Sequence, residues 1–265
     1  MFRLVVANQR GGVSKTTTTI TLARVLADDG LRVLAIDTDP QGSIGLVLGL
    51  KPRKYLDDFL IRNVPAAECV VSAAHGMDVL CSSRDTVQID GVLRGIDGRE
   101  SAFGRMLAGA EDGYDAIIID VAPSISLLQT CALWYAQNLL IPVGMDMLSL
   151  QGAVASLETA VQLSAVFHQE IRAIGFLPAM LDRRFSLTAY VMEALEQISQ
   201  QYGVPVLHPI RTDGSVPKAE RARKSLVDYD ARSKALEDYR AAAQQIRELW
   251  NAGAEPKRYA AALPA

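Results

Sequence analysis

A glycine-containing stretch near the amino terminus has the residue types of a phosphate-binding loop. Residues 8–17 read Asn-Gln-Arg-Gly-Gly-Val-Ser-Lys-Thr-Thr, after the apolar run of residues 4–7 and before a segment with helical spacing. A buried strand, a glycine turn and a new helix direct backbone N–H groups and the positive end of the helix dipole at one point. Lys15 would reach the terminal phosphates of a nucleoside triphosphate there, and the Thr16 hydroxyl would bind Mg²⁺.

The loop departs from the common pattern G-x-x-x-x-G-K-[ST] at two positions. Gln9 and Ser14 stand where that pattern has glycine, and the glycines are Gly11 and Gly12 instead. A glycine turn that binds no ligand is the alternative interpretation. A left-handed backbone at Ser14 would cost about 1–2 kcal/mol, whereas an ordinary backbone would cost nothing. The sequence leaves these two conformations of Ser14 open.

Two further apolar runs end in acidic residues. Residues 33–42 place Asp37 and Asp39 after one run, and residues 116–124 place Asp120 after another. The carboxyl ends of the strands of a doubly wound sheet carry its ligand site, and a carboxylate there holds Mg²⁺ directly or through water. Asp39 is therefore a candidate for positioning the attacking water, with a turn cap as its alternative role. Asp37 is expected to lie in the Mg²⁺ shell or to be structural.

These residues need a sheet that brings strand ends together, and the rest of the chain predicts one. Strand-like runs alternate with helix-like stretches, which favours an α/β fold: a doubly wound, mostly parallel sheet with helices on both faces. The expected strands are residues 4–8, 33–37, 77–81, 116–120, 139–143 and 171–177. The expected helices are residues 15–27, 102–110, 150–167, 187–201 and 236–250. We expect a single domain over residues 1–250 and a flexible tail over residues 251–265.

Composition excludes several classes of protein. The 265 residues suffice for one large α/β domain, and no apolar run reaches the ~18 residues that span a bilayer. The first residues do not resemble a signal peptide, so a cytoplasmic protein is expected. Cys69, Cys81 and Cys131 are widely spaced without a C-x-x-C pair, which favours buried thiols over a metal site or disulfides.

The motifs together resemble the ParA/MinD branch of P-loop ATPases, the deviant Walker A group. The signature of that group is K-G-G-x-G-K-[ST], and residues 10–16 here read Arg-Gly-Gly-Val-Ser-Lys-Thr. The similarity is greatest to the short ParA (Soj) partition ATPases and extends from about residue 2 to about residue 250. The additional matching segments are residues 37–42, 141–143, 180–184, 228–230 and 233–234. We expect no helix-turn-helix region like that of the longer ParA proteins before the loop.

The resemblance implies ATP and Mg²⁺ as ligands and assigns roles to the loop residues. Lys15 and Asp39 would be catalytic, with Arg10 as a third catalytic residue that replaces the signature lysine. Arg10 would reach the nucleotide of a second subunit in an ATP sandwich homodimer. The expected nucleotide-binding residues are Gly11, Gly12, Val13, Ser14, Lys15, Thr16, Thr17, Asp120 and Met180. The expected metal ligands are Thr16, Asp39 and Asp120.

A basic segment in the last quarter of the chain is the candidate DNA-binding surface. Residues 211–224 contain five basic and two acidic residues, although the whole chain has a net charge of −3. Arg211 matches an arginine in a segment of the family that contacts nonspecific duplex DNA. Another family position, near residues 193–198, often carries a basic residue and has none here. The candidate DNA-binding residues are Arg211, Lys218, Arg221, Arg223 and Lys224, with a solvated helix face as the alternative.

The resemblance implies a positioning ATPase of the nucleoid. ATP binding would drive dimerisation and DNA binding, and a ParB-like or other cargo adaptor protein would stimulate a slow hydrolysis. The cargo would be a plasmid, a chromosome origin or a large protein assembly. A MinD-like ATPase on a membrane surface would be a second class, but residues 256–265 offer few large aliphatic side chains for that. A metabolic ligase or an iron–sulfur carrier of the same fold would be a third class, and we expect no membrane partner.

Overall fold

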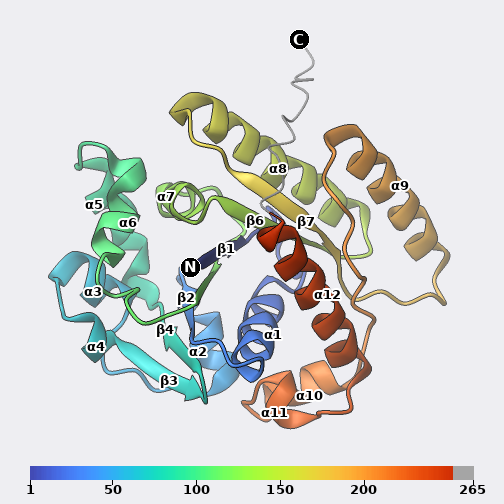
Figure 1. The fold of residues 1–265 in the computed structure, drawn as a ribbon, viewed down its shortest axis with the longest axis horizontal. Coiled ribbons are helices and arrows are strands. Elements are labelled where there is room, and N and C mark those ends of the chain that lie inside the picture. The colour runs from blue at the N-terminus through green and yellow to red at the C-terminus, as the bar shows by residue number, and fades with distance from the viewer. Residues whose placement is uncertain (253–265) are drawn as a thin grey trace.

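Seven strands form the central sheet of the computed structural model, which describes residues 1–252 (Figure 1). They are β1 (Phe2–Val6), β2 (Val33–Asp37), β3 (Val70–Ala74), β4 (Met77–Leu80), β5 (Ala116–Asp120), β6 (Asn138–Val143) and β7 (Arg172–Pro178). Their order in the sheet is β3-β4-β2-β5-β1-β6-β7. Only β3 pairs antiparallel, with β4, so the predicted doubly wound, mostly parallel sheet is confirmed for the described residues.

The central strands bury side chains on both faces, as the strands of a parallel sheet must when helices cover both sides. In β1, Leu4 and Val6 belong to one hydrophobic cluster, whereas Val5 belongs to the other. The alternation follows the two-residue period of a strand. The near-continuous apolar runs that suggested buried strands therefore supply two separate cores.

Helices from distant parts of the chain cover each face (Figure 1). One face is covered by α1 (Lys15–Asp28), α2 (Ser43–Leu48), α10 (Ser215–Arg221), α11 (Leu226–Tyr229) and α12 (Lys234–Asn251). The other is covered by α3 (Leu56–Arg62), α4 (Ala66–Cys69), α5 (Gln88–Arg94), α6 (Ala102–Leu107), α7 (Leu127–Ala136), α8 (Met147–Phe167) and α9 (Ser186–Tyr202). Two short 3₁₀ turns, Arg84–Val87 and Arg99–Ser101, lie on either side of α5.

The carboxyl ends of β1, β2 and β5 meet because β5 lies between the other two. Asp37, the last residue of β2, pairs with Asp120, the last residue of β5, and Val6 of β1 pairs with Asp120 on the other side. The register therefore places the predicted phosphate loop and both acidic strand ends side by side.

Six strands and five helices were predicted near their observed positions, with shifted ends. The edge strand β3 was not predicted, and neither was α7, whose sequence is apolar on most of its surface. Also not predicted were the short helices α2, α3, α4, α5, α10 and α11. Helix α12 continues to Asn251, and the rest of the predicted tail, residues 253–265, lies outside the described residues.

The three cysteines are buried free thiols, as predicted. Over residues 1–252, no helix combines the length and the apolar character needed to cross a bilayer.

Candidate functional site

The loop between β1 and α1 is shaped by left-handed residues. Gly12 has φ 76°, and Ser14 has φ 66° and ψ 26° immediately before Lys15 opens the helix. Of the two conformations considered for Ser14, the structure therefore has the left-handed one, in which the Cβ of an L-residue is strained. A Cβ added at Gly11 or Gly12 would meet no heavy atom within 4 Å, so this side of the loop faces open space.

Asn8 and Gln9 anchor the loop to α8, a role that the sequence did not reveal. The Asn8 amide donates to the carbonyls of Pro142 (2.7 Å) and Ser149 (3.1 Å), and its Oδ1 accepts the N–H of Arg10 (3.0 Å). The Gln9 side chain donates to the Thr159 hydroxyl at 2.9 Å. The only signal in the sequence was a polar residue at the end of a buried strand, and Asn8 is indeed fully buried.

Lys15 is buried at the start of α1, and its Nζ donates to the Arg10 carbonyl at 2.7 Å. Burial lowers the pKa of Lys15, although the charges of Asp120 and Asp39 act in the opposite direction. The ammonium group thus lies inside the loop near two carboxylates. The Arg10 side chain is exposed, which suits a residue that acts outside its own subunit.

Thr16 and Asp120 are in direct contact. The Thr16 hydroxyl donates to Asp120 Oδ2 at 2.6 Å, and the Thr19 hydroxyl lies 3.4 Å from Oδ1. Burial raises the pKa of Asp120 to about 7, while the Thr16 hydrogen bond and the Lys15 charge oppose the rise. A buried carboxylate of this kind gains most from a nearby cation.

Asp37 and Asp39 shape the turn after β2. Asp37 is fully buried and accepts the backbone N–H groups of Asp39 (3.0 Å) and Ile44 (2.9 Å). Burial and the charge of Asp120 raise the pKa of Asp37, against these two hydrogen bonds. Asp39 accepts the N–H of Gln41 at 2.9 Å, which is the turn-capping role. The structural role expected for Asp37 is thus the one its contacts display.

The donors present fit a magnesium ion bound together with phosphates. Among residues 1–252 there is no cluster of three or more His, Cys, Asp or Glu side chains that could hold a metal by itself. Mg²⁺ in nucleotide sites takes one or two protein oxygens and completes its shell with phosphate and water. The Thr16 hydroxyl and the Asp120 carboxylate form such a pair, and Asp39 lies close enough to influence Asp120.

Met180 lies apart from this hydrogen-bonded group. It follows β7 with φ 56° and is partly exposed, and its methyl group lies close to Gly144 after β6. The structure therefore places Met180 at the same edge of the sheet, two strands away from β1.

The basic segment divides into one paired and four unpaired cations. The Arg211 guanidinium forms two hydrogen bonds with the buried Asp238 (2.7 and 2.6 Å), and His208 Nε2 lies 3.2 Å from the same carboxylate. The four others form no ion pair within the described part of the chain and are exposed; they are Lys218, Arg221, Arg223 and Lys224.

The segment is tied to the phosphate loop through Glu220. The Thr17 hydroxyl donates to Glu220 Oε1 at 3.0 Å, linking the first turn of α1 to α10. The Arg24 side chain, further along α1, pairs with Asp228 of α11 at 3.1 Å. The predicted DNA-binding surface and the loop are therefore parts of one packed unit, although 203 positions separate Thr17 from Glu220 in the sequence.

Comparisons with known proteins agree with this geometry. A family model described as an AAA domain matches residues 2–173. The chain is 31% identical to the chromosome-partitioning ATPase Soj of Thermus thermophilus, over 92% of this chain and 94% of that protein.

Solved structures cover nearly the whole chain. A cobyrinic acid a,c-diamide synthase from Mycobacterium smegmatis with bound ADP and magnesium has a TM-score of 0.79 at 28% identity, over 96% of both chains. A variant of McdA from Cyanothece in complex with ATP has a TM-score of 0.81 at 21% identity, over 95% of this chain and 96% of that one. With its phosphate loop, its two acidic strand ends and these relatives, the chain belongs to the ParA/MinD family of P-loop ATPases.

Proposed function

We propose that the protein is an ATP-dependent, dimerising positioning ATPase that binds nonspecific duplex DNA and moves or spaces a cargo. The observation that carries the proposal is the convergence of Lys15, Thr16 and Asp120 beside Asp39. ATP with Mg²⁺ is the ligand that suits this set. Related structures that contain ADP with magnesium or ATP support that choice.

The protein groups have separate tasks in hydrolysis. Lys15 leaves the Arg10 carbonyl and neutralises charge on the β- and γ-phosphates as the γ-phosphoryl group departs. Bound Mg²⁺ supplies Lewis-acid polarisation of the phosphate oxygens. The Thr16 hydroxyl and the Asp120 carboxylate would hold the ion, and Asp39 would orient the attacking water from the turn that Asp37 keeps in place.

Arg10 acts across the dimer in this proposal. Its side chain is exposed, while its backbone is fixed by Asn8, so the guanidinium starts from a defined position on the outside of the loop. Arg10→Ala should abolish ATP-dependent dimerisation as seen by light scattering, and Arg10→Lys should restore most of it. A dimer that forms equally well with alanine would exclude the role.

The DNA part of the proposal relies on the basic segment. Four exposed cations without carboxylate partners in the described chain lie on and after α10, which Thr17 and Glu220 connect to the nucleotide loop. Neutralisation of DNA phosphates by such side chains is strongly salt-dependent. A ParB-like or other adaptor protein that stimulates hydrolysis completes the cycle and links it to a plasmid, a chromosome origin or a protein assembly in the nucleoid region.

The deciding experiment measures binding to nonspecific duplex DNA with ATP, with ADP and without nucleotide, at two salt concentrations. We expect binding only with ATP, weaker at high salt, lost in Lys15→Ala and weakened roughly tenfold in a Lys218→Ala/Lys224→Ala double variant. Absence of binding in every nucleotide state would reject the DNA surface. Binding to liposomes under those conditions would favour a MinD-like ATPase instead.

An amide-forming ligase is a second candidate because structures of a cobyrinic acid a,c-diamide synthase match this chain at 28% identity. The hallmark of such a ligase is ADP release that depends on an added carboxylic acid and an amine. ADP release that ignores such substrates but responds to DNA and an adaptor protein would exclude the ligase.

A further inference from the structure

A cavity of about 390 Å³ lies beside the turn that carries Asp39. Its walls are the segment 40–42, helix α2, the loop 50–55, the segment 81–84 and the side chain of Arg223. Its volume is within the range of ligand-binding pockets. We call it the cation cavity because Lys51, Arg84 and Arg223 line it.

No carboxylate balances these charges. Over residues 1–252, the lining contains no Asp or Glu, and none of the three cations forms an ion pair. The carboxylates of the neighbouring segments, Asp57 and Asp85, pair with Arg62 instead. Three like charges around one hollow repel one another, and a bound anion would relieve that repulsion.

Backbone conformation at two residues brings Arg223 close to the end of α2. Arg223 has φ 55°, and Gly49, which ends α2, has φ 65°. A Cβ added at Gly49 would lie 2.9 Å from Arg223 Cδ and 3.0 Å from its Cβ. The arginine therefore packs directly on the end of α2, so the basic segment reaches the loop that carries Lys51, which is far away in the sequence.

The cation cavity shares a wall with the nucleotide site. Gln41 and Gly42 line the cavity, and their N–H groups donate to Asp39 Oδ1 and to the Asp39 carbonyl, both at 2.9 Å. The Ser82 hydroxyl, also in the lining, donates to the same carbonyl. An anion in the cavity would thus lie against the turn that holds Asp39.

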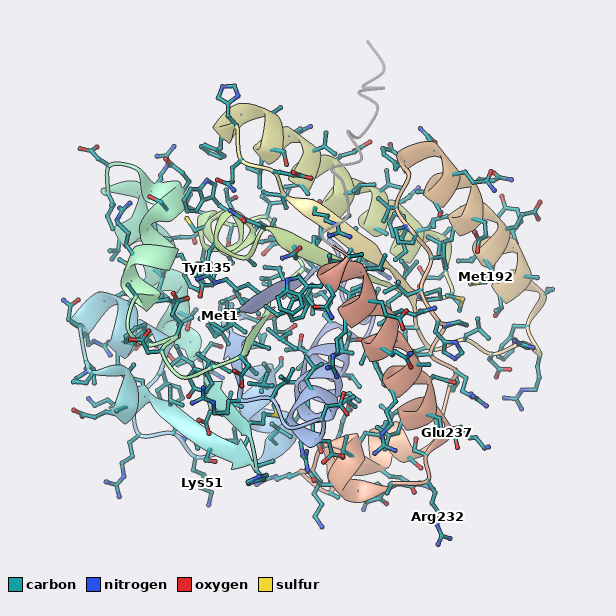
Figure 2. All side chains as sticks on the ribbon, viewed as in Figure 1. Met1, Lys51, Tyr135, Met192, Arg232 and Glu237 are labelled. Atoms are coloured by element: carbon teal, nitrogen blue, oxygen red, sulfur yellow. The ribbon has the colours of Figure 1, made fainter. Side chains whose placement is uncertain are left out.

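We propose that the cation cavity binds a backbone phosphate of duplex DNA. The proposal rests on the proposed DNA binding and enlarges its surface by Lys51 and Arg84, which lie outside the segment 211–224. Arginine forks grip phosphate oxygens in pairs, and Lys51 adds a point charge. In the view of Figure 2, Lys51 and Arg232 both lie at the lower edge of the molecule.

A matched pair of double variants tests the cavity in the full-length protein. Lys51→Gln/Arg84→Gln removes two cavity charges, and Arg94→Gln/Arg99→Gln removes two exposed charges on and after α5. With ATP, we expect the cavity variant to bind DNA roughly tenfold more weakly. The slope of log binding constant against log salt concentration should become less negative by about one or two. The control should change affinity less than about twofold. Equal salt slopes in wild type, cavity variant and control would overturn the proposal.

A second arm separates failure of the cavity from failure of DNA binding. In a Lys15→Ala background, inorganic pyrophosphate should raise the melting temperature, and adding Lys51→Gln/Arg84→Gln should abolish the rise. A different outcome is that wild type binds no DNA, while pyrophosphate still stabilises the Lys15→Ala protein and no longer does so once Lys51→Gln/Arg84→Gln is added. In that case the cavity holds a free phosphate compound and its assignment to DNA is wrong. If wild type binds no DNA and pyrophosphate has no effect, both the proposed function and the cavity are rejected.

Discussion

The phosphate loop and the basic surface both gather positive charge, but they do so in opposite ways. In the loop, Lys15 is buried beside the carboxylates of Asp120 and Asp39 and held by a backbone carbonyl. On the surface, the cations from Lys218 to Lys224 are exposed and lack carboxylate partners in the described chain. A buried, compensated site is organised before its ligand arrives, whereas a surface of independent charges acts additively.

The comparison predicts its largest effect at Lys15. Lys15→Ala should weaken ATP binding by about a hundredfold, roughly 3 kcal/mol, because a buried charged hydrogen-bond donor has no substitute. Lys218→Ala on the surface should weaken DNA binding only about two- to fivefold, since one phosphate contact is lost among several. Calorimetry with ATP and fluorescence anisotropy with DNA measure the two values. Effects of similar size would contradict the distinction.

Substitution of Asp120 should lower activity without lowering stability. Asp120→Asn should reduce ATP turnover by about a hundredfold, because a carboxylate oxygen is lost beside Thr16 at the proposed metal site. Its melting temperature without nucleotide should be equal or higher, since burial already raises the pKa of Asp120 to about 7 and so penalises its charge.

Asp37→Asn is the matched control for that substitution. Asp37 accepts two backbone N–H groups, one on each carboxylate oxygen. An asparagine side chain has an oxygen at only one of these two positions, so this variant should lose about 1–3 kcal/mol of stability. Unfolding in urea and steady-state phosphate release test both variants. Full turnover in Asp120→Asn would disprove the assignment of the metal ligand.

Arg211 is an exposed cation that is paired with a buried carboxylate, Asp238. Arg211→Ala would leave Asp238 with His208 as its side-chain partner and should lower the melting temperature, whereas Lys224→Ala should leave it almost unchanged. Loss of DNA binding in Arg211→Ala therefore indicates a DNA contact only if a melting curve shows that the variant is still folded. Equal melting temperatures for the two variants would show that the Asp238 pair is unimportant.

The stabilising effect of the Arg211–Asp238 pair depends on pH with a defined sign. Burial opposes ionisation of Asp238, yet hydrogen bonds from Arg211 and His208 hold its pKa below the ordinary value. A lowered pKa in the folded state stabilises the protein above about pH 4 and loses its effect as the pH falls through the folded value. The stability difference between wild type and Arg211→Ala should therefore shrink in acid, and a difference that grows would contradict this.

The smallest effect is expected at Ser14. Ser14→Gly should stabilise the nucleotide-free protein by about 1 kcal/mol, because glycine adopts the left-handed backbone without a Cβ clash. Ser14→Ala keeps the Cβ and should give no stabilisation. Denaturant midpoints measure both, and a gain in the alanine variant would place the cause in the hydroxyl group.

Much of the fold and of the loop could be predicted from residue order alone. The strand ends could be located from apolar runs followed by Asp37 and Asp120, because hydrophobic patterning and the polar residues that end it are local properties of the chain. Strand β3 was missed because it is a short, half-exposed edge strand, and α7 because its sequence is apolar on nearly every side. The anchoring of Asn8 to α8 could not be foreseen, since its partners lie more than 130 residues away.

The sequence by itself determined the residue types of the loop before α1, since Lys15 and Thr16 follow a glycine turn whatever surrounds them. Tertiary structure alone decided which charges are compensated. Arg211 and Arg223 are equivalent in a count of basic residues, but one meets the buried Asp238 and the other packs on Gly49 beside an uncompensated cavity. Electrostatic partners depend on distance in space, and the sheet and its helices bring together residues that the sequence keeps far apart.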